Sequence, residues 1–148
     1  MRAVIQKVTH ADVTVEGKIT GAIGLGLMVL LGVSDADTDE DLDYMVRKIT
    51  QLRIFEDDQD KMNLSVRDVG GAFLVISQFT LFANTKKGNR PSFIEAGAPE
   101  FSNRMYERFI ERLRSMGFQT ECGVFGAHMQ VSLLNDGPVT IIMDSKNR

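Results

Sequence analysis

The sequence predicts a single α+β domain that is rich in mixed strands and carries two main helices. The length of 148 residues suits one hydrophobic core, so residues 1–148 are expected to form one domain. Two segments carry apolar residues at helical spacing, whereas most of the remainder alternates or forms short apolar runs between turn residues. No repeat, low-complexity stretch or linker divides the sequence.

The N-terminal region predicts a β-hairpin. Residues 2–9 have the composition of a strand, and Val13 and Val15 share one face of a second strand. Gly17 marks a turn into a further strand at residues 18–23.

A buried strand and then a helix are expected next. LGLMVLLGV at residues 25–33 is a continuous apolar run, which suits a strand covered on both faces. Residues 37–54 predict the clearest helix, with Thr38 and Asp41 in the positions of a capping box. The apolar stripe of this helix consists of Leu42, Met45, Val46, Ile49 and Leu52.

The middle of the chain predicts a second buried strand, a basic loop and the second helix. AFLVISQFTLFA at residues 72–83 is apolar enough for a buried strand, and NTKKGNRP at residues 84–91 is expected to form a basic loop. The second helix is expected from Pro99 to Met116, with Gly117 placed to cap its C-terminus.

Three short strands are expected in the tail, at residues 119–124, 129–134 and 139–144, because polar and apolar residues alternate there. Residues 135–138, NDGP, are expected to form the turn between the last two strands. A bond between glycine and proline also permits the cis isomer.

The bulk composition argues against several classes of protein. With a net charge of −3, non-specific binding to DNA or RNA is not expected, so an RNA contact needs a local basic patch or a shaped pocket. The longest apolar run is too short to span a membrane, and no secretory leader is expected from the N-terminal residues. Cys122 is the only cysteine, which fits a reducing compartment. We therefore expect a cytoplasmic protein with no membrane or DNA partner.

Familiar catalytic and metal-binding patterns are missing. Only His10 and His128 could join carboxylates around a metal, and neither common zinc spacing is present, so we expect no metal and no other cofactor. The nucleophile elbow G-x-S-x-G is absent, and a cysteine–histidine pair would have to use Cys122. Cys122 is better explained as a packing or surface residue, and His10 and His128 as solvent-exposed residues.

Polar side chains interrupt the apolar run at residues 72–83, at Ser77, Gln78 and Thr80. Buried polar groups need hydrogen-bond partners, so these side chains point to solvent, bond neighbouring strands or belong to a site. By composition alone the first two explanations are preferred, and a tight turn is likewise the simplest explanation of residues 135–138.

Several blocks of the sequence together resemble one family. SQFTLFA at residues 77–83, GNRPSF at 88–93 and MQVSLLNDGPVT at 129–140 resemble the D-aminoacyl-tRNA (D-tyrosyl-tRNA(Tyr)) deacylases. The resemblance extends to the N-terminal VIQKVTHADVTVEGKITGAIGLGLMVLLGV and to RIFEDDQDKMNLSV at 53–66. Because these blocks are colinear from end to end, the match is more specific than any single motif. It implies a barrel-like arrangement of the strands.

The resemblance implies an enzyme that hydrolyses the ester bond of D-aminoacyl-tRNA and releases a free D-amino acid and tRNA. It also implies a homodimer whose active sites lie at the subunit interface. Gly137 and Pro138 would form a Gly–cis-Pro motif that enters the partner's pocket, with Lys7 near this turn in place of the family's usual arginine. The catalytic floor would be lined by Ser77, Gln78, Phe79 and Thr80, and the terminal adenine would pack on Phe125, with Met129 near the turn.

The implied chemistry needs no side-chain nucleophile. Backbone N–H groups of Phe79 and Thr80 would stabilise the oxyanion, and the terminal 2′-hydroxyl of the tRNA would assist the attack. An alternative makes Thr80 the nucleophile, which is disfavoured because no adjacent base is evident. Main-chain carbonyls of Gly137 and Pro138 would reject L-isomers by steric exclusion, and glycyl-tRNA would be cleaved to some extent.

Binding of the tRNA body is expected at a basic loop that contains Lys86, Lys87 and Arg90, with a solvated loop as the alternative. An arginine stripe on the second helix is better explained as structural; it contains Arg104, Arg108 and Arg112. Two other functions stay open. One is a tRNA- or peptide-binding module without catalysis, and the other is a small dimeric ester hydrolase that acts on metabolites.

Overall fold

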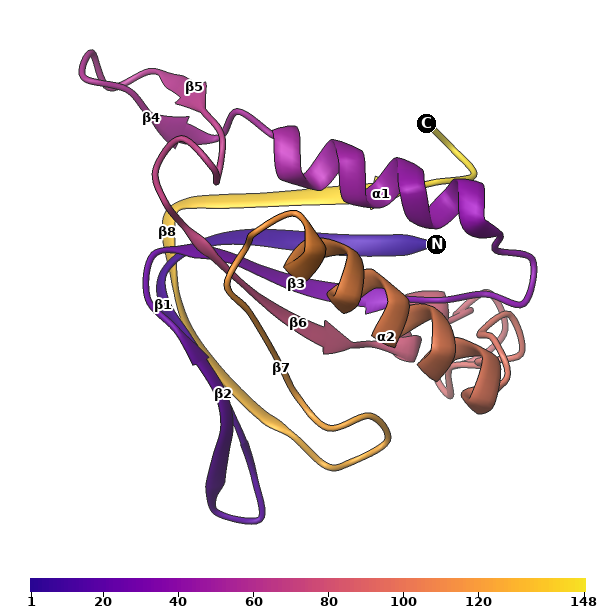
Figure 1. Cartoon of the computed structure of the whole chain (residues 1–148). Coiled ribbons are helices and arrows are strands. Elements are labelled where there is room, and N and C mark those ends of the chain that lie inside the picture. The colour runs from indigo at the N-terminus through magenta and orange to yellow at the C-terminus, as the bar shows by residue number, and fades with distance from the viewer.

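The computed structural model describes residues 1–148 and contains one six-stranded sheet, a small hairpin and two α-helices. The sheet has the order β2-β1-β3-β6-β7, and β8 pairs with β1 from Arg2 to Thr14. It curls into a nearly closed, barrel-like form with both helices on one side (Figure 1), which confirms the predicted α+β class. Its strands are β1 (Arg2–Val15), β2 (Lys18–Ile23), β3 (Gly26–Gly32), β6 (Ala72–Ser77), β7 (Thr120–Cys122) and β8 (Gln130–Asp144).

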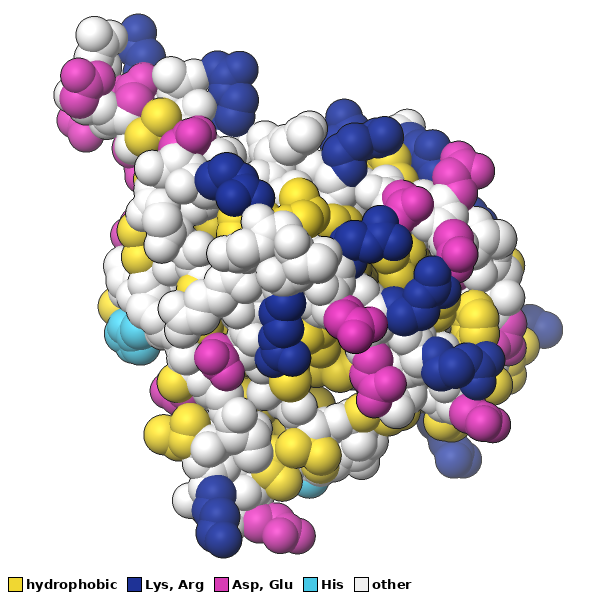
Figure 2. All heavy atoms as spheres, viewed as in Figure 1, with side chains coloured by type: hydrophobic (Ala, Val, Ile, Leu, Met, Phe, Trp, Pro, Cys, Tyr) yellow, Lys and Arg dark blue, Asp and Glu magenta, His cyan; other side chains and the backbone are white.

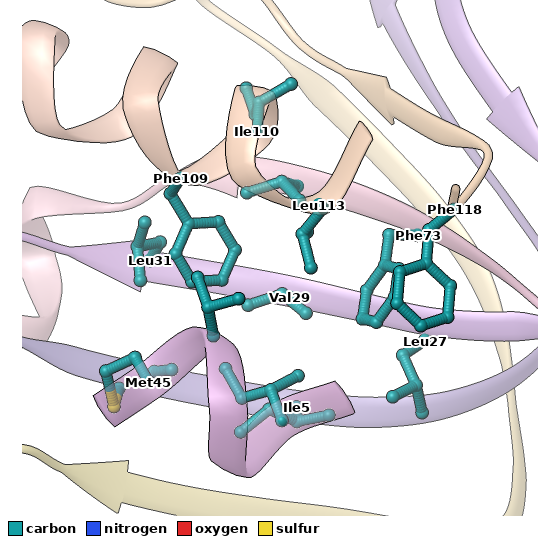
Figure 3. Packing of buried hydrophobic residues seen from close by; sticks show 14 of the residues in the cluster. Ile5, Leu27, Val29, Leu31, Met45, Phe73, Phe109, Ile110, Leu113 and Phe118 are labelled. Carbon is teal, nitrogen blue, oxygen red and sulfur yellow. The ribbon is translucent and has the colours of Figure 1, made fainter. Parts of the chain in front are cut away.

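Apolar cores lie on both faces of the sheet. The parallel pair β3–β6 is central and almost entirely buried, as the continuous apolar run of β3 predicts. Leu27 and Val29 belong to the larger core beneath the helices, whereas Met28 belongs to the smaller core on the other face. Figure 3 shows Phe109 and Leu113 projecting from α2 onto β3. Full burial of such side chains stabilises the fold by roughly 1.5–3 kcal/mol each.

Two helices, α1 (Asp39–Gln51) and α2 (Pro99–Ser115), cover the larger core. The bounds of α2 confirm the prediction: Pro99 is its first residue, and Gly117 adopts a φ of +88° directly after Met116. Neither helix combines the length and the apolar character that crossing a membrane requires.

The predicted helix at residues 37–54 is too long at both ends. Asp41 accepts a hydrogen bond from Thr38 N at 2.8 Å, so the predicted cap starts the helix after Thr38. Asp37 stays outside because its carboxylate accepts a hydrogen bond from Ser34 N at 2.8 Å and also binds the N-terminal amine. At the other end Leu52 has a ψ of 124°, so the helix ends at Gln51, three residues before Ile54.

The N-terminal hairpin is confirmed, but its first two predicted strands are one. The predicted strand at residues 2–9 continues without interruption to Val15, and β1 keeps its pairing with β8 through register shifts on both sides of Val8. These irregularities let one long strand bend instead of ending.

A small hairpin follows α1 and was not predicted. It consists of β4 (Phe55–Glu56) and β5 (Met62–Leu64), and it projects from the body of the molecule (Figure 1). The turn between the two strands is held by Asp57, whose carboxylate accepts hydrogen bonds from Gln59 N and Lys61 N at 2.9 and 3.0 Å. A few polar residues are enough to form such carboxylate–backbone hydrogen bonds. The stretch therefore lacks the apolar alternation from which strands are predicted, and its two short strands were missed.

The apolar run at residues 72–83 is not one strand, which corrects the placement of Ser77–Thr80 inside a strand. β6 ends at Ser77, and η1 (Phe79–Phe82) is a short 3₁₀-helix. Gln78 O accepts a hydrogen bond from Leu81 N at 3.3 Å, which turns the chain. Gly32 makes room for this turn, since a Cβ there would lie 3.0 Å from Gln78 O.

The tail also differs from the prediction. The strands expected at residues 129–134 and 139–144 are parts of β8, and residues 135–138 do not reverse the chain between them. β7 is likewise shorter than the predicted 119–124. Both halves of β8 find their partner in β1, which bends along with it, so no hairpin is needed.

Residues 136–139 form a bulge in β8, here called the Gly–Pro bulge. Between the pairs Val8–Asn135 and Gln6–Thr140, β8 advances five residues while β1 advances two. Three extra residues of β8 therefore project from the sheet opposite Lys7. The peptide bond between Gly137 and Pro138 within this bulge is cis.

Candidate active site

A cleft of about 530 Å³ opens at the carboxyl end of β6. Its walls come from the end of β6 with the start of η1, the loop before α2, the first turn of α2 and the loop between β7 and β8. Most of the lining is apolar or aromatic, with a few polar groups among it. Such a lining suits a flat organic group whose polar edges need a small number of hydrogen bonds.

Five residues singled out by the sequence line this cleft: Ser77, Gln78, Phe79, Phe125 and Met129. The topology explains how segments so distant in sequence meet. β6 and β7 pair in parallel, so the residues that follow the two strands emerge side by side at the same edge of the sheet.

The start of η1 supplies two free backbone donors. Phe79 N and Thr80 N occupy the first positions of the 3₁₀-helix, where a backbone N–H has no acceptor within the helix, and neither donates elsewhere in the chain. Thr80 lies beside the cleft instead of lining it, and its hydroxyl oxygen accepts a hydrogen bond from the Gln78 amide. Two N–H donors next to Ser77 are the type of group that stabilises a developing oxyanion.

Phe125 forms a fixed aromatic wall. Its ring packs against Tyr106 at a centroid distance of 6.1 Å, and the Tyr106 hydroxyl donates a hydrogen bond to Val75 O at 2.8 Å. Burial raises the pKa of Tyr106 well above its ordinary value, so this phenol stays neutral and serves as a support. Two further aromatic residues of the lining, Phe79 and Phe93, pack edge-on at a centroid distance of 5.1 Å.

Several lining residues were not anticipated, among them Phe93, Ser102 and His128. Phe93 ends the GNRPSF block, so the block itself contained the signal. His128 was assigned to a solvent-exposed loop; it is exposed, but the loop folds over the cleft. Ser102 is only 7% exposed and its Oγ has no hydrogen-bond partner, which no sequence pattern reveals.

The Gly–Pro bulge lies away from this cleft. Val131 of β8 lines the cleft, and Gly137 lies six residues further along the same strand. At ~3.3 Å per residue this places the bulge on the order of 20 Å away. Gly137 and Pro138 are exposed and are not part of the cleft lining of their own chain.

The bulge is tied to β1 at its base. The side-chain amide of Asn135, with its nitrogen toward the carbonyls of Lys7 and Val139, makes a hydrogen bond of 3.0 Å to each. Its oxygen then accepts hydrogen bonds from Thr140 Oγ1 and Gln6 Nε2 at 3.0 and 3.1 Å. The two ends of the bulge are thereby held at fixed points on the sheet.

Lys7 lies at the bulge, as the resemblance implies, and not in the cleft. The residue is 1% exposed, and its Nζ lies 2.6 and 2.7 Å from the two carboxylate oxygens of Glu56. A carboxylate oxygen of Asp136 lies 3.6 Å away. The hydrogen bonds from Lys7 hold the pKa of Glu56 below its ordinary value, so the pair is charged at neutral pH.

Comparison with known proteins identifies one family. The family model described as D-Tyr-tRNA(Tyr) deacylase matches residues 4–144. The chain belongs to the D-Tyr-tRNA(Tyr) deacylase family. A D-aminoacyl-tRNA deacylase of Flavobacterium johnsoniae is 57% identical over 149 residues, which cover 100% of this chain and 99% of that relative.

Solved structures related to this deacylase-family chain share its fold. The structure of a c-Myc DNA unwinding element binding protein is 47% identical with a TM-score of 0.91, covering 97% of this chain and 98% of that one. A structure described as "a probable eukaryotic D-amino acid tRNA deacylase" is 21% identical with a TM-score of 0.81, covering 96% and 97%. The second likeness supports the fold alone.

In this deacylase-family chain the arginine stripe of α2 is engaged in ion pairs. Arg108 contacts Asp39 of α1 at 2.7 Å, and Arg112 pairs with Asp43 of the same helix. Arg104 lies 3.9 Å from Glu100. Figure 2 shows basic and acidic side chains interspersed over the helices, so this surface does not concentrate positive charge.

The basic loop behaves differently. Lys86, Lys87 and Arg90 are exposed and take part in none of the ion pairs of the chain. The loop begins directly after η1, and two backbone hydrogen bonds between Asn84 and Ser92, of 2.8 and 2.9 Å, close its base. The unpaired cations of this loop therefore follow η1, the element whose first residue lines the cleft.

Proposed function

We propose that this chain removes D-amino acids from tRNA by hydrolysing the aminoacyl ester bond. The observation that carries the proposal is the match of the deacylase family over residues 4–144, together with a relative named D-aminoacyl-tRNA deacylase that is aligned over 99% of its length. In the reaction water adds to the ester carbonyl, the bond to the terminal ribose oxygen breaks and that oxygen takes up a proton. The products are a free D-amino acid and tRNA.

The proposed active site is assembled from two copies of the chain. The Gly–Pro bulge and the cleft of one chain lie on the order of 20 Å apart along β8, so each cleft receives the bulge of its partner. A homodimer with two-fold symmetry forms two such sites at once, because the same pair of surfaces meets twice.

Catalysis in this proposal relies on the backbone and the RNA. The N–H groups of Phe79 and Thr80 face the ester carbonyl and stabilise the oxyanion, an effect worth a few kcal/mol per donor. The 2′-hydroxyl of the terminal ribose assists the attack of water. Ser77 and Gln78 position the ester, and the terminal base packs on Phe125 beside Met129. Thr80 is not the nucleophile, because its hydroxyl is bonded to Gln78 and has no base beside it.

Discrimination between the two hands of the amino acid is assigned to the main chain of the bulge. The carbonyls of Gly137 and Pro138 hold the α-amino group, so a D-side chain points outward while an L-side chain collides with backbone. This backbone surface of the Gly–Pro bulge, here called the main-chain wedge, rejects every L-side chain regardless of its size. Glycine has no side chain to exclude, and glycyl-tRNA is therefore cleaved to some extent.

Contact with the tRNA body is assigned to the basic loop. Lys86, Lys87 and Arg90 carry unpaired charges, whereas the three arginines of the α2 stripe lie beside acidic partners. Cations free of acidic partners bind phosphates at lower cost, since no ion pair has to be broken.

To test the proposal, the purified protein is incubated with D-Tyr-tRNA, L-Tyr-tRNA, Gly-tRNA and a simple ester of D-tyrosine. We expect rapid cleavage of D-Tyr-tRNA, slower cleavage of Gly-tRNA and only the spontaneous rate on the other two. Equal rates on both tyrosyl-tRNAs would contradict the main-chain wedge. Cleavage of the free ester alone would favour a hydrolase of metabolites.

DNA binding is a second candidate, because a related structure of 47% identity is named as a DNA unwinding element binding protein. The net charge of −3 and the paired arginines of α2 argue against a general phosphate-binding surface here. Gel-shift titrations with duplex and single-stranded DNA at physiological salt should show no complex. A DNA complex in a protein that does not cleave D-Tyr-tRNA would replace the proposed function.

A further inference from the structure

We infer that Glu56 is a positioning residue for the Gly–Pro bulge, acting through Lys7 on Asp136. The inference rests on the proposed function, because it concerns how sharply the bulge distinguishes D- from L-aminoacyl esters. Glu56 belongs to the small β4–β5 hairpin, which contributes no residue to the cleft. Its link to the site is the ammonium group of Lys7.

The ammonium of Lys7 is buried and needs anionic partners. Its stem leaves β1 on the face that also carries Ala3 and Ile5, and the whole residue is 1% exposed. The Nζ atom lies 6.0 Å from the centre of the Phe55 ring, so an aromatic side chain also borders the ammonium group. A buried charge without partners is costly, so the position of this ammonium is set by the carboxylates near it.

Two carboxylates compete for this one ammonium. Glu56 lies on the hairpin side and binds Nζ with both oxygens at 2.6 and 2.7 Å, whereas Asp136 lies on the bulge side at 3.6 Å. Glu56 therefore holds the ammonium toward the hairpin. If Glu56 loses its charge, Asp136 becomes the only anion close to Nζ, and Lys7 and Asp136 move toward each other.

Such a movement reaches the wedge directly, because Asp136 precedes Gly137. The base of the bulge is fixed by the Asn135 amide, so a pull on Asp136 changes the orientation of the Gly137 carbonyl and leaves the sheet in place. Steric exclusion is sensitive to such shifts, since a misplacement of about 1 Å can change an enzymatic rate by roughly 100-fold.

The test compares Glu56→Gln with Asp58→Asn, a matched variant on the same hairpin. Both remove one negative charge, but Asp58 has no contact with Lys7. The Glu56 side chain is 43% exposed, so a neutral amide there remains solvated. We expect E56Q to lower the ratio of kcat/KM for D-Tyr-tRNA over L-Tyr-tRNA by about tenfold, and D58N to leave the ratio unchanged. Glu56→Asp keeps the charge on a shorter stem and should give an intermediate ratio.

A double-mutant cycle tests whether Glu56 acts through Lys7. Lys7→Met keeps the apolar stem and removes the ammonium, and the carboxylates of Glu56 and Asp136 that lose their partner are 43% and 47% exposed, so they remain solvated. In the K7M background, E56Q should produce no further change in the ratio. Thermal unfolding gives the Tm of each variant, and the assay temperature is set well below it. The ratio is then measured on folded protein. An unchanged ratio in E56Q and E56D, or an equal effect of E56Q with and without Lys7, would overturn the inference.

A separate variant keeps the two proposals distinguishable. Pro138→Ala alters the bulge itself and leaves the side chains of Lys7, Glu56 and Asp136 unchanged. If P138A leaves the D-to-L ratio unchanged, the wedge in the proposed function is wrong. If P138A lowers the ratio and the Glu56 variants do not, the wedge stands and the positioning role of Glu56 fails.

Discussion

Gly137 is restricted to glycine by its backbone angle and by its surroundings. Its φ is +117°, and an added Cβ would lie 2.7 Å from Val139 Cγ2. We expect Gly137→Ala to lower kcat/KM for D-Tyr-tRNA by roughly 10- to 100-fold, because the bulge has to change shape before it can enter a cleft. Steady-state kinetics measure this loss. Gly70→Ala is the control, since Gly70 also has a positive φ, of +65°, but nothing within 4 Å. Equal losses in the two variants would show that the bulge has no special role.

Asp41 sets an acid limit on the stability of the fold. Burial works against its charge, yet hydrogen bonds from Lys146, Ser145 and Thr38 outweigh burial and hold the pKa of Asp41 below its ordinary value of 3.8. Its contribution to stability is therefore complete above the pKa of the unfolded chain and is lost as the pH falls through the lower pKa of the folded state. We expect the thermal midpoint to fall as the pH drops below about 4. Asp41→Asn should be less stable at pH 7 and show a shallower acid dependence by circular dichroism. An identical acid profile in the variant would assign the effect to other carboxylates.

At the scale of elements, the position of η1 depends on a glycine in another strand. A Cβ on Gly32 would lie 3.0 Å from Gln78 O and 3.1 Å from the Phe82 ring. We expect Gly32→Ala to destabilise the protein by about 1–3 kcal/mol, as overpacking does, and to reduce turnover because the N–H groups of η1 shift. Urea unfolding and kinetics on D-Tyr-tRNA measure the two effects. Gly24→Ala is the control, since its nearest atom would be 4.0 Å away. Wild-type turnover in a destabilised Gly32→Ala would separate η1 from catalysis.

Elements with a strong local signal were predictable, and the breaks between them were not. α2 follows from helical spacing between a proline and a glycine, and β3 follows from its apolar run. The change from strand to 3₁₀-helix after Ser77 depends on space beside Gly32, which only the folded chain defines. Turn residues at 135–138 indicated a change of direction, but the presence of β1 alongside makes the segment a bulge. The family resemblance predicted Ser77 to Phe79 and Phe125 as site residues, and they line the cleft, whereas Ser102 enters the cleft only through packing of α2.

At the scale of the whole molecule, the proposed dimer predicts complementation between two inactive variants. Gly137→Ala disables the bulge, and Phe125→Asp disables the cleft by placing a charge in its aromatic wall. In a mixture of equal amounts, half of the dimers contain one chain of each kind, and each of these has one intact site. We expect about a quarter of the wild-type activity from the mixture after subunit exchange. Activity no higher than the sum of the separate variants would place both features in the same chain's site or in none.

β8 forms hydrogen bonds with β1 along one edge only, so its other edge carries unpaired backbone groups. Ile142 on the same strand is 79% exposed. A long open edge of this kind can recruit strands from other chains and start aggregation, and proteins commonly protect it with a bulge or a proline. Pro138 offers no N–H, and the residues around it break the straight run of the strand. A variant in which this stretch were straightened would therefore be expected to precipitate at high concentration, whatever its effect on catalysis.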